Sequence, residues 1–187
     1  MIYPQKLTSK KSNFIVKLGI IISLFIGVIF TIINKFVNSH IHWSAIVNGA
    51  IFYLWIVLFY TIREKINIAG HVLLHAIAIS ILNIYIDYEI GFKGWSINVA
   101  LPVIIIISNI AMLILTIISH KQFIKYAIYQ LMIVLLSSIP FILLTENIIQ
   151  NRVLSIIATS ISIINLIVSL VWCTKDLKEA LIRKIHI

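Results

Sequence analysis

The stretch GWSINVALPVIIIISNIAMLILTII, residues 94–118, decides the fold of this chain. It holds no Asp, Glu, Lys or Arg. It is long enough to cross the hydrocarbon core of a bilayer, which takes roughly 20 mostly apolar residues. Because lipid offers the backbone no hydrogen-bond partner, a spanning segment must be a helix or a strand of a closed barrel. The apolar run is continuous and does not alternate with period two, so it predicts a transmembrane helix.

The rest of the chain has the same character. Of 187 residues, 61% are hydrophobic and 11% are charged, whereas a soluble domain has roughly 25% charged residues. Short connections join the apolar runs, so neighbouring helices are expected to be antiparallel. We therefore predict an all-α fold, a polytopic transmembrane bundle of six helices. The six apolar runs are residues 15–37, 43–62, 68–86, 95–118, 123–144 and 153–172.

Three regions follow from this pattern. Residues 1–14 form a basic N-terminal segment, and residues 15–173 form the six-helix transmembrane domain. The run 15–37 is too long for the apolar core of a signal peptide, so we expect it to be a retained helix. In residues 174–187, Leu177, Leu181 and Ile185 lie four apart with charged residues between them. This spacing predicts a basic amphipathic helix on the inner membrane surface, or a docking surface for a partner.

The basic residues predict the orientation. Twelve of the 15 Lys and Arg lie at the N-terminus, at the C-terminus and in the second and fourth connections; the other three are Lys35, Lys93 and Arg152. The positive-inside rule then places both termini in the cytoplasm of a cell-membrane protein. The bilayer is the expected partner, with anionic lipids at the cytoplasmic face. Nucleic acid is not expected, because the basic residues are dispersed over the helix ends.

Two Trp-Ser pairs open apolar runs on the expected outer side, at Trp43-Ser44 and Trp95-Ser96. Indole prefers the membrane interface, where the ring is half buried and its N–H stays wet. Interfacial anchoring is thus the first interpretation. A Trp-lined outer binding site is the alternative.

Polar residues inside the spans fall on one face of each helix at 3.6 residues per turn. Small and amide side chains of this kind form helix–helix contacts in lipid. The alternative is that the faces of the second, fourth and sixth helices line a polar cavity. The candidate cavity residues are Asn48, Trp55, Asn98, Asn109, Thr159 and Ser162. Similar faces in the first and fifth helices hold Gly19, Ser23, Gly27, Gln130 and Ser137.

His71 and His75 lie four residues apart, so they share a face of the third helix. Ionisable residues at membrane depth are functional candidates, which makes these two a candidate intramembrane pair. We expect both to point inward and to bond groups of neighbouring helices. Two imidazoles are too few for a zinc site, so no metal and no cofactor is predicted. Asp87 and Glu89 follow the third apolar run, and their pattern predicts a solvated loop.

Four segments carry a resemblance to a known family: HWSAIVNGAIFYLW, GFKGWSINVALP, KYAIYQLMIVLLSSIPFILL and DLKEALIRKIHI. They resemble an uncharacterised family of six-helix integral membrane domains, a domain of unknown function of low-GC Gram-positive bacteria. The likeness runs in register over residues 43–187. Relatives often carry a zinc ribbon before this domain, but residues 1–17 hold no Cys, so that metal site is not carried over.

The resemblance also bears on function. The relatives that this chain resembles are often encoded near acyltransferase-like and α/β-hydrolase-like proteins. It implies a non-catalytic membrane subunit that anchors or supplies a partner enzyme of lipid or acyl metabolism. The chain shows no Ser-His-Asp pattern and no Gly-rich phosphate loop. The alternative is a small-solute or lipid carrier, or an intramembrane enzyme that uses the polar faces of the second, fourth and sixth helices with His71 and His75.

Overall fold

The computed structural model describes residues 6–37, 42–63, 67–118 and 123–185, without the side chains of residues 6–13, 15, 62, 63, 123–125, 170 and 172–185. Within these ranges the chain is helical and contains no strand. The elements are α1 (Lys6–Val37), α2 (Trp43–Arg63), α3 (Ile68–Glu89), η1 (Ser96–Ala100), α4 (Leu101–Ile118), α5 (Phe123–Thr145) and α6 (Arg152–Ile185). The prediction of an all-α fold is confirmed.

Six helices in the described ranges are long and apolar enough to span a bilayer, with η1 and α4 counted as one span. Each predicted apolar run falls in one of them. The chain is therefore a multi-pass membrane protein. Its long apolar side chains are widely exposed along the helices, which suits a surface in contact with lipid.

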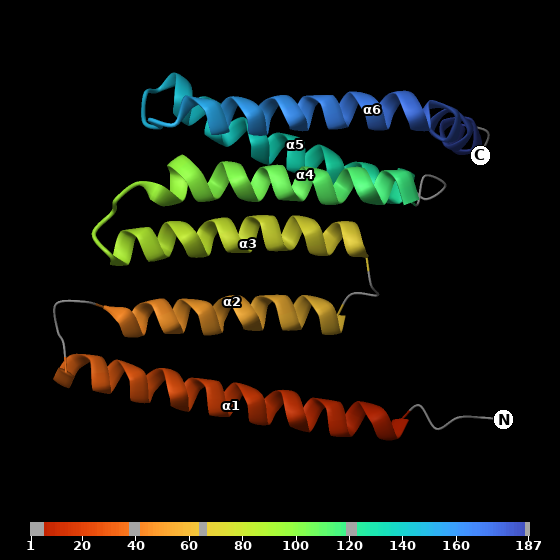
Figure 1. Cartoon of the computed structure of the whole chain (residues 1–187). Helices are drawn as coiled ribbons and strands as arrows, with labels where there is room; N and C mark the ends of the chain where they lie inside the picture. The colour runs from red at the N-terminus through yellow and green to blue at the C-terminus, as the bar shows by residue number, and fades with distance from the viewer. Residues whose placement is uncertain (1–5, 38–41, 64–66, 119–122, 186–187) are drawn as a thin grey trace.

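Successive helices run in opposite directions (Figure 1), so that α1 begins and α6 ends at the same end of the molecule. We call this the terminal end, and we call the opposite end, with the connections after α1, α3 and α5, the loop end. α1 to α4 follow one another as a row in Figure 1, and α5 and α6 lie beside α4.

The row divides into a packed part and a peripheral hairpin. α3, α4, α5 and α6 contact one another closely, and two apolar clusters lie among them, around Met112 and around Ile105. α1 has its main contacts with α2 alone, and α2 joins the hairpin to α3. The candidate residues of α2 therefore lie in a different environment from those of α4 and α6.

A π-helical turn opens the fourth span. Pro102 has no N–H and cannot donate a hydrogen bond inside the first turn of the helix. The N–H of Leu101 instead donates to the carbonyl of Ser96, five residues earlier. Gly94, with φ +76, reverses the chain just before this turn. Wide turns of this kind are frequent at functional sites, and this one places Ser96 and Asn98 at the loop end.

Candidate functional site

The carboxylate of Asp87 holds the loop between α3 and η1 from inside the protein. Asp87 is fully buried. Its Oδ1 accepts a hydrogen bond from the N–H of Lys93 (2.9 Å), and its Oδ2 accepts from the N–H (3.2 Å) and the hydroxyl (2.7 Å) of Ser96. A carboxylate with three such donors is well compensated for its burial. Asp87 thus fastens the start of the fourth span to the end of α3.

The prediction of a solvated loop is wrong for Asp87. α3 continues to Glu89 instead of ending at residue 86, and this extra turn carries the carboxylate inward. Glu89 is also mostly covered, with 14% of its side chain exposed, and its Oε2 lies 3.3 Å from Nδ1 of His42. The two acidic residues therefore connect the segments of the loop end.

Asn98 joins η1 to the connection between α5 and α6. Its Nδ2 donates to the carbonyl of Gly94 (2.7 Å). Its Oδ1 accepts from the N–H groups of Gln150 (2.6 Å) and Asn151 (3.2 Å). The side chain is half-buried and, in the described structure, bonds only backbone groups. Its position is that of a clamp between two loops.

Asn109 lies at the contact of α4 and α6. The Nδ2 of Asn165 donates to the carbonyl of Asn109 (2.8 Å) and lies 3.3 Å from its Oδ1. Both side chains are buried. The prediction that the face with Asn109 points into the bundle is confirmed, because this amide meets a neighbouring helix and not lipid.

Thr159 and Ser162 follow one another along α6. The Thr159 hydroxyl donates to the carbonyl of Ser155 in its own helix (2.7 Å), and the side chain is half-buried. Ser162 is fully buried, and its hydroxyl has no partner in the described part of the chain. The Thr159 hydroxyl is thus bonded within its own helix, whereas the Ser162 hydroxyl, one turn later, is not.

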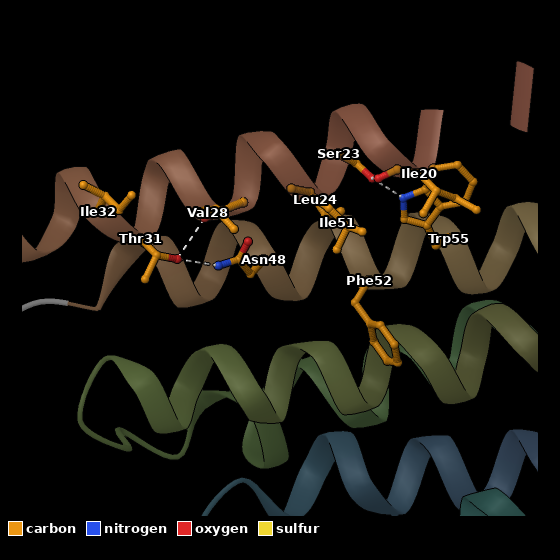
Figure 2. Close-up of a pocket in the computed structure, with 11 residues that line it drawn as sticks. Ile20, Ser23, Leu24, Val28, Thr31, Ile32, Asn48, Ile51, Phe52 and Trp55 are labelled. Carbon is orange, nitrogen blue, oxygen red and sulfur yellow. Dashed lines mark hydrogen bonds between the residues drawn. The ribbon is translucent and has the colours of Figure 1, made fainter. Parts of the chain in front are cut away.

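A polar seam joins α1 to α2 (Figure 2). The indole N–H of Trp55 donates to Oγ of Ser23 (2.8 Å), and Nδ2 of Asn48 donates to Oγ1 of Thr31 (3.1 Å). At Gly27, which is buried in the seam, an added Cβ would collide with Oδ1 of Asn48. A larger residue at position 27 would therefore require the Asn48 amide to move.

The same seam forms the floor of an open groove. Its volume is about 460 Å³, and apolar side chains such as Leu24, Ile32 and Phe52 form most of its lining. A second groove of about 330 Å³ lies on the other side of α2 and shares Asn48 and Phe52 with the first. Asn48 and Trp55 therefore face the side of the α1–α2 hairpin and not the interior of the α3–α6 part.

The two histidines of α3 face tyrosines of α2. The hydroxyl of Tyr53 lies 2.7 Å from Nδ1 of His75. The ring of His71 meets the ring of Tyr60 edge-on, with centroids 4.9 Å apart. Both imidazoles also line a groove of about 290 Å³ between α3 and α4, together with Ser108. The expectation that the pair bonds a neighbouring helix is confirmed for His75.

The six candidate cavity residues occupy three separate places. Two lie in the seam of α1 and α2, one lies among the loops, and three lie in α4 and α6. None of the three grooves described above includes both α2 residues and α6 residues. The structure thus does not gather these residues into one cavity.

Several polar contacts involve residues that the sequence pattern did not single out. The sequence pattern predicts a solvated position for Asp87 and does not distinguish Tyr53 or Thr31 from their apolar neighbours. A signal did exist for Tyr53, because Tyr53 and Tyr60 lie seven apart, as two turns of a helix require. A single sequence does not indicate which neighbouring helix a polar face contacts. The residues that bond these side chains are therefore identified only by the structure.

The described ranges hold no group of three or more His, Cys, Asp or Glu side chains arranged to share an ion. The side chain of Cys173 lies outside the described part.

Comparison with known proteins gives one finding. The family described as "Family of unknown function (DUF6320)" matches residues 3–187. No curated protein and no solved structure matches the chain.

Proposed function

Since the chain belongs to the family of unknown function DUF6320, we propose a function from its own residues: a non-catalytic membrane subunit that anchors or supplies a partner enzyme of lipid or acyl metabolism. In this proposal the protein lies in the cell membrane of a bacterium with both termini in the cytoplasm. The partner contacts the α1–α2 hairpin within the bilayer and the basic terminal end outside it.

The observation that carries the proposal is the exposure of the α1–α2 hairpin. Only 6% of the residues in the apolar part of α1 are buried, and the share in α2 is also 6%. In the span formed by η1 and α4 it is 39%. Two helices thus add little to the packed core of the chain. They present their surface, including a groove with a polar floor, to other molecules in the membrane. Anchoring a partner uses such a surface, whereas catalysis requires converging reactive groups.

The polar groups in the α3–α6 part support the same conclusion. Asp87, Asn98 and Asn109 are engaged with backbone or side chains of the chain itself. A catalytic carboxylate needs access to a substrate, but Asp87 is fully buried and has donors on both oxygens. The hydrogen bonds of these residues hold helices and loops together.

The net charge of +9 suits the second contact. In the predicted orientation, twelve basic residues face the cytoplasm. They would attract anionic lipids and acidic surfaces of a partner within a Debye length.

The proposal is tested by purifying the full chain from native membranes in a mild detergent. Bound proteins are identified by mass spectrometry, and each is assayed for acyl transfer or ester hydrolysis with and without the chain. We expect one enzyme whose activity in membranes falls when the chain is removed. The Gly27→Leu variant, which disrupts the α1–α2 seam, is expected to lose that enzyme. The Ile163→Leu variant, at an exposed position of α6 outside the hairpin, is expected to retain it. An enzyme activity unchanged by loss of the chain would contradict the proposal.

One contact favours the alternative class. His75 has a hydroxyl on Nδ1 and lies in the groove between α3 and α4, so a carrier or an intramembrane enzyme would use this groove. Purified chain in proteoliposomes tests it. Turnover or transport by the chain alone, abolished in His75→Ala, would establish this alternative and exclude the subunit role.

A further inference from the structure

Four buried polar side chains in α5 and α6 have polar atoms without a hydrogen-bond partner. These atoms are Nε2 and Oε1 of Gln130, Oγ of Ser162, Oδ1 of Asn165 and Oγ of Ser169; none finds a partner in the described part of the chain. Gln130 is 2% exposed, and the other three are at most 1% exposed. Buried polar atoms in proteins are nearly always bonded, to protein or to ordered water.

In the described structure, Ser162 and Ser169 do not make the hydrogen bond to their own helix that other hydroxyls of this protein make. Ser108 donates to the carbonyl four residues earlier in its own helix, and Ser137 to the carbonyl three residues earlier. Thr159, one turn before Ser162, does the same. In the described part of the chain, the hydroxyls of Ser162 and Ser169 make no such bond to their own helix and are buried.

Gln130, Asn165 and Ser169 lie near one level of the bundle, and Ser162 lies about one turn of α6 before Asn165. Gln130 lies fifteen residues before the end of α5, and Ile167 lies fifteen residues after the start of α6. The two helices are antiparallel neighbours with the same rise per residue, so Gln130 lies opposite residues between Asn165 and Ser169. On α6 the positions 162, 165 and 169 share one face. Asn109 reaches this level from α4 through its contact with Asn165.

We infer that the α4–α6 interior binds water as an internal hydration site, in the half of the bundle toward the terminal end. The chemistry of the unpaired groups selects this ligand. Gln130 offers a donor and an acceptor, Asn165 offers an acceptor, and each serine hydroxyl offers both. A metal ion would leave the Gln130 amide N–H facing a positive charge, and an anion would face the two amide oxygens. Water satisfies all of them, because it donates and accepts.

The site is distinct from the grooves of the α1–α2 hairpin and does not depend on the proposed subunit role. Water at this level gives the α3–α6 part a polar interior in a bilayer. The surrounding helices are apolar on their outer faces.

Cysteine accessibility tests the inference. In a Cys173→Ser background, single variants Ser162→Cys, Ser169→Cys and Ala158→Cys are prepared in full-length protein in nanodiscs. Ala158 lies on the same face of α6 and is fully buried, but in the apolar cluster with Leu101 and Ile105. A thiol reacts as the thiolate, which apolar burial suppresses. We expect a small water-soluble thiosulfonate to modify Ser162→Cys and Ser169→Cys about tenfold faster than Ala158→Cys. Equally slow reaction at all three positions would refute a hydrated interior.

A second measurement separates hydration from a packing defect. Gln130→Met keeps the shape of the side chain and removes its polar atoms. If water bonds Gln130, the melting temperature in detergent falls; if the amide is dry, it rises, because an unsatisfied group has been removed. A rise would overturn the inference. Labelling in Na⁺, in K⁺ and in choline is expected to proceed at one rate, and protection by either metal ion would replace water by a cation as the ligand.

Discussion

Asn165 of α6 donates its side-chain amide to the backbone carbonyl of Asn109 in α4 over 2.8 Å, with both residues 1% exposed. This is a contact between two spans that are not neighbours in sequence order. In hydrocarbon the amide has no alternative partner. It therefore fixes the register of α6 against α4, and it gives a buried amide a partner inside the bundle.

We predict that Asn165→Leu destabilises the protein by about 0.6 kcal/mol and by no more than about 1.7 kcal/mol, the range found for hydrogen bonds between membrane helices. Unfolding in mixed detergent, followed by circular dichroism, measures the change. Ile163→Leu, at a lipid-facing position of the same helix, is the control and should be neutral. A larger loss in the control would show that the assay reports lipid contacts.

Asp87→Asn tests the hydrogen bonds by which Asp87 holds the start of the fourth span against the end of α3. The amide nitrogen of Asn would face the N–H of Lys93 or the two donors of Ser96, so one oxygen acceptor is lost. Hydrogen bonds to charged groups contribute about 1.5–3 kcal/mol each, and we expect a loss of this size in the free energy of unfolding. Glu89→Gln, whose side chain contacts the largely exposed His42 and also bonds the hydroxyl of Tyr85, should change stability less. Equal effects of the two variants would contradict a special role for Asp87.

The sequence predicts the six spans because long apolar runs and the lipid solvent leave no other regular structure. The ends of the spans are less well determined. Residues 87–89 extend α3 because Asp87 finds donors in a loop that follows it by six to nine residues, and hydropathy does not register such a contact. The four-residue spacing of His71 and His75 predicts that they share a face of α3, and the structure confirms this, because both line the groove between α3 and α4.

The partners of the polar faces could not be predicted from periodicity. Amide side chains on one face indicate that this face contacts protein, but they do not indicate which neighbouring helix it contacts. Asn48 and Asn98 look alike in this respect, yet one meets α1 and the other meets the loop before α6. The difference arises from the order of the helices in the row, which is a property of the fold.

Gly27→Ala tests the close approach of α1 to α2. The added Cβ collides with Oδ1 of Asn48, so either the Asn48–Thr31 hydrogen bond breaks or the helices separate. Overpacking of this kind costs about 1–3 kcal/mol. We expect the loss in a denaturant titration of the purified protein. Phe25→Ala, at an exposed position of the same helix, is the matched control, and a stability of Gly27→Ala equal to wild type would show that the seam yields without cost.

Tyr53→Phe removes the hydroxyl that bonds His75. The imidazole is then held less firmly, and loss of a bond worth about 0.6 kcal/mol raises the exposed population about threefold. Modification by diethylpyrocarbonate, measured by mass spectrometry for each histidine, should become faster at His75. The rate at His71, which contacts Tyr60, serves as the internal control. Parallel increases at both residues would indicate general loosening of α3.

The orientation of the chain is predicted by its basic residues. Phe92 lies at the loop end and is 55% exposed, and the loop end carries few of the Lys and Arg. In a Cys173→Ser background, Phe92→Cys should react with a membrane-impermeant maleimide in intact cells. A cysteine appended after Ile187 should react only after permeabilisation, because the positive-inside rule keeps the basic end in the cytoplasm. The opposite pattern would reverse the orientation while leaving the six-helix fold intact. Reaction of both cysteines in intact cells would contradict the prediction that the loop end and the terminal end lie on opposite sides of the bilayer.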